Sequence, residues 1–184
     1  MSNGTTVKKR NGRGVEPLNL EKIHVMCEEA CEGLAGVSAS QVEIQSGIQF
    51  YDGITTAEIQ EILIRSASDL IDLDHPNYQF VAARLLLFAL RKQIFGRMRE
   101  MPIVIDHVKK CVTKGVYDSE ILDLYTEEEY NKLQSFIDHS RDFLFTYAGL
   151  RQVVDKYLVQ DRSSGEVYET PQFMYMMIAA TIFS

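Results

Sequence analysis

The chain has 184 residues, enough for one domain of ordinary size or two small ones. With 46% hydrophobic and 24% charged residues it can form an apolar core, which argues against a disordered tail, a collagen or a disulfide-stapled miniprotein. Its 19 basic and 26 acidic side chains give a net charge of −7, which argues against a general nucleic-acid-binding protein.

The first 95 residues predict a short β-hairpin followed by four helices. Residues 5–10 have β character, Asn11-Gly12 is a strong hairpin turn, and a short return strand is expected at 14–18. Apolar residues then recur at the spacing of amphipathic helices. The helices are expected at residues 20–34 with Asn19 as N-cap, at 38–50 with a capping box of Ser38 and Gln41, from Thr55 with a capping box to Glu58, and from Asp74 and Pro76 to Gly96.

The remaining residues are again mostly helical and contain one further hairpin. The expected elements are helices at 102–114, 126–138 and 147–158, strands at 157–160 and 166–169 around a turn, and a final apolar helix opened by Pro171. The segment 96–102 is the predicted boundary between a domain at 1–96 and a region at 97–184. The fold class is therefore mainly α: a four-helix bundle capped by a short hairpin or sheet, followed by a helical segment with one hairpin.

The cysteines and the N-terminus indicate a reducing cytoplasm. Cys27, Cys31 and Cys111 are odd in number and have no C-x-x-C spacing, which argues against a disulfide framework or a zinc ribbon. The N-terminus has no apolar segment of a signal peptide, and the longest apolar run, 173–183, is too short to span a bilayer. That final run has no polar cap, so we expect either a truncated longer chain or an end that docks onto a partner.

The start of the chain is a candidate anion site. Lys8, Lys9, Arg10 and Arg13 precede the first acidic residue and are expected to form one wall of a phosphate pocket. The predicted helix start at Asn19 adds backbone N–H groups and the positive end of a helix dipole. A solvated basic surface is the alternative. Thr56, at another helix start, and Lys92, at the end of the fourth helix, have either capping roles or a place in the same pocket.

No catalytic set is recognisable. His24, His75, His107 and His139 are scattered without metal-binding spacing, and the chain has no Walker loop, G-x-S-x-G or H-E-x-x-H motif. The residues by themselves therefore predict nucleotide binding without catalytic or metal-binding residues.

Three segments of the first half resemble an ATP-cone: VKKRNGRGVEPLNLEKI (7–23), QVEIQSGIQFYDGITTAEIQEILIRSASDLI (41–71) and HPNYQFVAARLLLFALRKQIFG (75–96). The segment 136–184, with its D-H-x-R-D, K-Y-L-V-Q and E-T-P-Q-F runs, is similar to the helical region that follows the cone in the large subunit of class Ia ribonucleoside-diphosphate reductase. The resemblance covers essentially the whole chain.

This resemblance implies an allosteric domain that binds ATP or dATP, with Mg²⁺, and regulates the synthesis of deoxyribonucleotides for DNA replication. The nucleotide contacts it implies are Lys9, Glu16, Pro17, Leu18, Asn19, Leu20, Glu21, Lys22, Thr56 and Lys92. Lys9, Lys92 and the helix start would meet the phosphates, and Glu16 would face the base or ribose. Gln60 stands where relatives carry His, which removes any imidazole contact there.

The family's catalytic cysteines, radical relay and barrel are expected beyond residue 184, so the chain should be inactive alone. The implied partners are the rest of the large subunit, in the same or a separate chain, the small radical-bearing subunit, and further copies in a homo-oligomer. No nucleic acid or membrane is expected as a partner. The alternative is a nucleotide-independent interaction module derived from an ATP-cone, which needs only the bundle and the apolar C-terminal helix for docking.

Overall fold

A computed structural model describes residues 4–9 and 14–183, which form two compact units. The first unit holds the described residues up to Ala89 together with Phe145–Leu150, and the second holds Leu90–Leu144 and the residues from Arg151 onward. Within the described residues there are eight α-helices, a three-stranded sheet and a two-stranded sheet. The predicted mainly α class is therefore confirmed, while the boundary near residue 96 stays a prediction.

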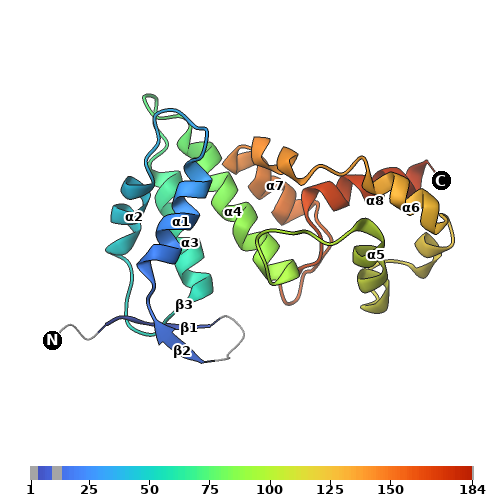
Figure 1. Ribbon diagram of the computed structural model, residues 1–184, viewed down its shortest axis with the longest axis horizontal. Coiled ribbons are helices and arrows are strands. Elements are labelled where there is room, and N and C mark those ends of the chain that lie inside the picture. Colours follow the sequence, from blue (N-terminus) through green and yellow to red (C-terminus); the bar gives the residue numbers. More distant parts are fainter. Residues whose placement is uncertain (1–3, 10–13, 184) are drawn as a thin grey trace. The chain divides into compact units, whose positions relative to one another are not determined.

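The first unit is a helical bundle with a small sheet at one end (Figure 1). Its elements are β1 (Thr6–Lys8), β2 (Val15–Pro17), α1 (Leu20–Cys31), α2 (Ala39–Gly47), β3 (Ile54–Thr55), α3 (Thr56–Asp69) and most of α4 (Tyr78–Phe95). The predicted hairpin is confirmed as the antiparallel pair β1–β2. Its predicted turn at Asn11-Gly12 lies outside the described residues, as do Arg10 and Arg13.

The sheet has a third strand that the sequence did not predict. β3 pairs parallel with β1, with Val7 opposite Ile54 and Lys8 opposite Thr55, which gives the order β2-β1-β3. Two residues are too few to show an alternating pattern, so only the folded chain reveals this strand. It places the start of α3 directly beside the hairpin.

Two of the three side-chain caps predicted for the helices of this unit are confirmed. Asn19 Oδ1 accepts a hydrogen bond from Lys22 N (3.0 Å), and the Thr55–Glu58 capping box of α3 is complete. The predicted capping box of α2 is wrong, because Ser38 makes no side-chain cap. Gln41 instead accepts a hydrogen bond from the hydroxyl of Tyr78, and the same hydroxyl accepts the backbone N–H of Ser38.

The core of the first unit is formed by the apolar faces of its helices. On α1 the buried residues are Ile23, Met26, Cys27 and Ala30, as the helical spacing predicts. Helix α4 is apolar on nearly all sides, and Arg84 is its one cation within this unit. Its guanidinium donates to the carbonyl oxygens of Ala30 (3.2 Å) and Glu32 (2.6 Å), which satisfies acceptors left open at the C-terminal end of α1.

The second unit contains the end of α4 and the remaining elements. They are α5 (Val104–Thr113), the 3-10 helices η1 (Ser119–Leu122) and η2 (His139–Leu144), α6 (Glu127–Gln134), most of α7 (Tyr147–Lys156), β4 (Gln160–Asp161), β5 (Glu166–Val167) and α8 (Pro171–Ile182). The predicted helices and the second hairpin are confirmed, although α6 ends earlier than expected. The two 3-10 helices were not predicted.

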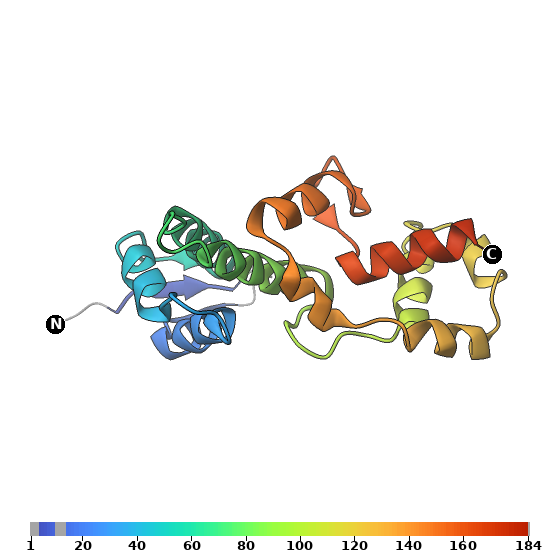
Figure 2. The same cartoon turned by 90° about the horizontal axis from the view of Figure 1, so that it is seen from above.

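Helices α5, α6 and α8 surround one apolar core in the second unit, and α8 lies beside α5 and α6 in both views (Figures 1 and 2). Val104 and Val108 of α5, Tyr130 of α6, and Phe173 and Met177 of α8 are among its buried residues. Among the helices of the described residues, none is long and apolar enough to cross a membrane.

Candidate nucleotide-binding site

The candidate site begins on one face of the β1–β2 hairpin. Side chains alternate along a strand, and directly opposed residues of an antiparallel pair share a face. Val7 is buried and pairs with Glu16, so Glu16 lies on the face that packs toward the bundle. Lys9 follows two residues after Val7 and shares this face. Lys8 points to the opposite face.

Glu16 connects the hairpin to the first turn of α1. Its Oε2 lies 3.1 Å from Lys9 Nζ, and its Oε1 lies 3.8 Å from Lys22 Nζ. Lys22 also donates its backbone N–H to Asn19, the N-cap residue of α1. Two ammonium groups from different elements therefore gather on one carboxylate beside a helix N-terminus, where anions are favoured.

Lys8 belongs to a different network, on the side of β3. A Cβ added at Gly53 would lie 3.6 Å from Lys8 Cε, and Gly53 has a positive φ of 80°. Hydrogen bonds from Thr55 and Tyr51 lower the pKa of Glu58 to about 2, with a smaller contribution from the Lys8 charge. The structure thus separates Lys8 from Lys9, although the sequence suggested one wall of cations.

The remaining predicted nucleotide contacts also lie in the first unit, except for Lys92. Together with Asn19, Pro17, Leu18, Leu20 and Glu21 form the continuous segment between Glu16 and Lys22, and Leu18 N donates to the carbonyl of Thr5 (2.8 Å). Leu20 and Glu21 are exposed.

Thr56 is the first residue of α3, and Gln60 follows one turn later on the same face, almost fully buried. Lys92 lies in the last turn of α4, in the second unit. The first unit by itself therefore brings together Lys9, Glu16, the α1 start and Lys22.

The cysteines and histidines do not form a reactive centre. Within the described residues, no group of three or more His, Cys, Asp or Glu side chains is arranged to hold a metal ion. Burial raises the pKa of Cys27 to about 12, and burial also raises those of Cys31 and Cys111 to about 11. These thiols stay protonated near neutral pH, so they are poor nucleophiles.

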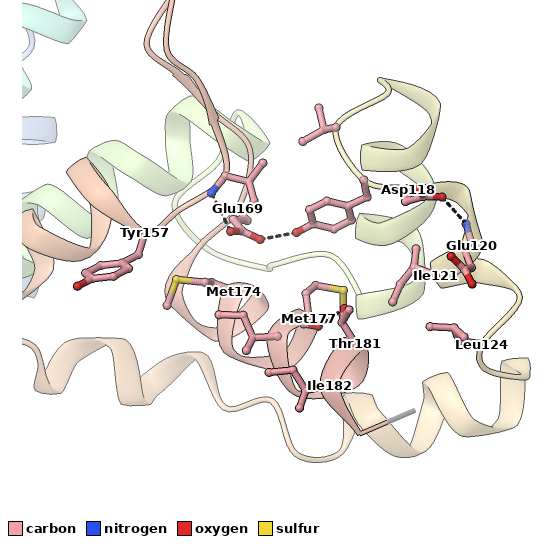
Figure 3. Close-up of a pocket in the computed structure, with 14 residues that line it drawn as sticks. Asp118, Glu120, Ile121, Leu124, Tyr157, Glu169, Met174, Met177, Thr181 and Ile182 are labelled. Carbon is pink, nitrogen blue, oxygen red and sulfur yellow. Dashed lines mark hydrogen bonds between the residues drawn. The ribbon is translucent and has the colours of Figure 1, made fainter.

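The second unit contains an apolar groove of about 520 Å³ along α8 (Figure 3). Met174, Met177, Ile178, Thr181 and Ile182 line it at the spacing of one helical stripe. Segments around η1 and β4 form the other walls, and the carboxylates of Asp118 and Glu120 add negative charge to the lining. The sequence predicted an apolar C-terminal helix but not this groove.

A buried acid lies at the wall of the groove, and sequence reasoning missed it. Glu169 accepts hydrogen bonds from the hydroxyl of Tyr117 and from Val159 N (2.8 Å), as Figure 3 shows. Burial raises the pKa of Glu169. The only sequence signal was the E-T-P-Q-F run, which carries no chemical signature.

A second cluster of buried polar residues in this unit is centred on Arg91. Its Nη2 donates to the carbonyl of His139 (2.7 Å) and to Asp142 Oδ2 (3.3 Å). Burial raises the pKa of Asp142 to about 6, which the Arg91 charge only partly offsets. Because these residues hold η2 to the end of α4, their position favours a structural role over chemistry.

The family comparisons match both halves of the chain. Residues 5–93 match the ATP cone domain, and residues 143–184 match the ribonucleotide reductase all-alpha domain. Over its full length, the chain is 50% identical to ribonucleoside-diphosphate reductase 1 subunit alpha of Escherichia coli (strain K12), of which it covers 24%. It is 49% identical over 184 residues to the alpha subunit of Haemophilus influenzae, again covering 24% of that protein.

A more distant relative is the alpha subunit of enterobacteria phage T4, at 46% identity over 149 residues, which are 80% of this chain and 20% of the relative. The chain therefore spans about a quarter of the length of the curated relatives it matches. Within the described residues the only sheets have three and two strands, so the catalytic barrel implied by the resemblance is not in this quarter. The chain belongs to the ribonucleoside-diphosphate reductase alpha-subunit family, matching its N-terminal quarter with an ATP-cone and part of the all-alpha domain.

Proposed function

We propose that the chain is the activity-regulating part of a class Ia ribonucleoside-diphosphate reductase large subunit and senses ATP against dATP. The observation that supports this best is the gathering of Lys9 and Lys22 beside the capped start of α1. This arrangement lies within the residues that match the ATP cone domain.

The described residues fit a nucleoside triphosphate. Two flexible ammonium groups and the exposed N-terminal turn of α1 suit the phosphates. In this proposal Lys92 also contacts the phosphates, Thr56 adds a hydroxyl, and Glu16 faces the base or ribose. Mg²⁺ accompanies the nucleotide and is held mainly by its phosphates. The resemblance implies that ATP activates the enzyme and dATP inhibits it. A ligand shifts an equilibrium between two conformations only if it binds them with different affinities, so we propose that ATP and dATP favour different conformations of the subunit.

A direct test is calorimetry of the chain with ATP and dATP, using a pair of neighbouring lysines. Lys9→Ala removes a cation from the site and should weaken binding about tenfold or more, as expected for a lost charge-assisted contact to phosphate. Lys8→Ala makes the same change on the opposite face of the hairpin and should leave the affinity nearly unchanged. Equal effects of the two substitutions, or no binding by the folded parent chain, would contradict the proposal.

The groove on α8 supports a second proposal, which concerns partners. Its apolar stripe, which is exposed at Ile178 and Ile182, suits another helix, and the relatives continue for about three quarters of their length beyond the matched part. We infer that the rest of the large subunit covers this groove, in the same or a separate chain. The small radical-bearing subunit and further copies of the large subunit are the other proposed partners, and the predicted location is the cytoplasm.

A nucleotide-independent docking module stays the alternative function, and the same groove favours it. In that case both lysine substitutions leave function intact, whereas shortening the chain after Pro171 abolishes partner binding. The calorimetric result with ATP separates the two functions, because only the regulatory domain requires nucleotide affinity.

A further inference from the structure

The carboxylate of Glu16 occupies an unusual position between the two lysines of the candidate site. Each of its oxygens faces a different ammonium group, Lys9 Nζ at 3.1 Å and Lys22 Nζ at 3.8 Å. We propose that Glu16 is an internal competitor of the effector's phosphates, which holds the ammonium groups of Lys9 and Lys22 until a polyanion displaces it. This inference rests on the proposed nucleotide-binding function and deepens it.

The backbone fixes Glu16 more firmly than it fixes the lysine heads. Glu16 lies within β2, paired with Val7, so its carboxylate stays near the hairpin face. The side chain of Lys22 is largely exposed and that of Lys9 is about half exposed, and each ammonium group sits at the end of a flexible four-carbon chain. The lysine heads can therefore turn from the carboxylate toward an anion at the start of α1 without any change in the strands.

Competition of this kind discriminates by charge and reach. The Glu16 carboxylate already gives each lysine an ion pair. A small anion that binds one lysine must replace that ion pair, so its net gain in binding free energy is small. A chain of three phosphates carries several charges and is long enough to contact both lysines and the helix N-terminus together. Glu16 thus lowers the affinity for all anions, and the loss is largest for a polyphosphate, which displaces both ion pairs and brings the most negative charge near the carboxylate.

The expected size of the effect follows from the exposure of the ion pairs. Solvent-exposed pairs of this type are weak and are further screened by salt. Removing the competing charge should therefore tighten polyphosphate binding by about three- to tenfold at low ionic strength, and by less at high ionic strength.

Inorganic tripolyphosphate is the decisive probe, because it has no base or ribose for Glu16 to contact. Calorimetry at low salt compares the parent chain with Glu16→Gln, which keeps the shape of the side chain but removes its charge. We expect Glu16→Gln to bind tripolyphosphate about three- to tenfold more tightly and to bind inorganic phosphate more tightly by a smaller factor, which widens the preference for tripolyphosphate. Glu32→Gln, at the opposite end of α1, makes the same change in net charge and should alter neither affinity.

The outcomes separate the inference from the proposed function. If the parent chain binds ATP but Glu16→Gln binds tripolyphosphate no more tightly than the parent, the competition is refuted. An equal gain with Glu32→Gln also refutes it, because net charge alone then explains the effect. If the folded parent chain does not bind ATP, the proposed function fails and this inference fails with it. Glu16→Asp keeps the charge on a shorter stem, and its affinity should lie between those of the parent and Glu16→Gln.

Discussion

Burial sets the protonation state of His107 in the second unit. Its ring stacks on Phe173 with centroids 4.1 Å apart, and its Nε2 lies 3.4 Å from the Tyr117 hydroxyl and 3.7 Å from Cys111 Sγ. Burial, together with smaller contributions from the nearby charges of Lys110 and His139, lowers the pKa of His107 to about 4. The folded protein therefore keeps this imidazole neutral well below its ordinary pKa.

This shift predicts a loss of stability in mild acid. The unfolded chain protonates His107 below about pH 6.5, and the folded chain only below about pH 4, so the unfolded state binds more protons in this window. The free energy of unfolding therefore falls as the pH falls. Burial gives His139 a pKa of about 4 as well, and it adds to the fall. Asp142, with a raised pKa of about 6, acts in the opposite direction and offsets one of the two histidines.

His107→Phe tests this account, because phenylalanine keeps the stacking on Phe173 and cannot be protonated. Between pH 7 and pH 5 the variant should lose roughly 1–2 kcal/mol less stability than the parent chain. Urea denaturation at the two pH values measures the difference. A variant that loses as much stability as the parent would show that His107 does not cause the acid sensitivity.

For single residues, the sequence predicts a role correctly where that role depends on residues close by in the chain. Asn19 was predicted as a cap because the helix pattern begins directly after it. Lys8 and Lys9 were grouped because they are adjacent, but strand alternation places them on opposite faces. Glu169 and His107 were missed because only burial, which depends on distant segments, distinguishes them from ordinary surface residues.

Helix caps are the element-scale feature that can be tested most directly. The Thr55 hydroxyl accepts the N–H of Glu58 (3.1 Å), and Glu58 Oε2 in turn accepts the N–H of Thr55 (2.8 Å). The same reciprocal pair, Thr126 with Glu129, begins α6. Ser38 occupies the equivalent position of α2 but makes no side-chain cap. Two hydroxyl residues at helix starts thus have different energetic roles.

Thr55→Ala should destabilise the first unit by about 1 kcal/mol, the usual contribution of an N-cap hydroxyl. Ser38→Ala is the matched control and should change the stability by less than about 0.5 kcal/mol. Hydrogen exchange of the α3 and α2 amides reports each loss where it occurs. Similar losses at both positions would mean that the side-chain cap on α3 contributes nothing beyond an ordinary helix start.

The element order was predictable from sequence because caps, turns and helical spacing are local signals. The failures have non-local causes. The Ser38–Gln41 pair has the pattern of a capping box, but Tyr78, distant in the sequence, takes both groups. The strand β3 depends on pairing with β1 rather than on its own two residues. Contacts made only in the folded chain therefore decide these positions.

At the scale of the whole molecule, both units expose large apolar side chains, and those on α8 line a groove. In the first unit, two exposed isoleucines, Ile44 and Ile48, lie on and just after α2. In the second, Ile178 and Ile182 continue a stripe that already lines a groove. A pair of exposed apolar residues on a helix surface is ordinary, whereas an apolar groove with several walls indicates a binding surface. This contrast supports the proposal that the rest of a large subunit covers α8.

A chimera in which this chain replaces the matching quarter of the Escherichia coli relative provides the test. In the 184-residue chain, Ile178→Glu or Ile182→Glu should change stability by only about 0.5 kcal/mol, because both side chains are exposed. In the chimera the same changes should cost about 2 kcal/mol or more, because a charge would then be buried under the following segment. Ile44→Glu and Ile48→Glu should have small effects in both proteins. Urea denaturation of both proteins measures these differences, and equally small effects of all four substitutions in the chimera would show that α8 stays exposed there.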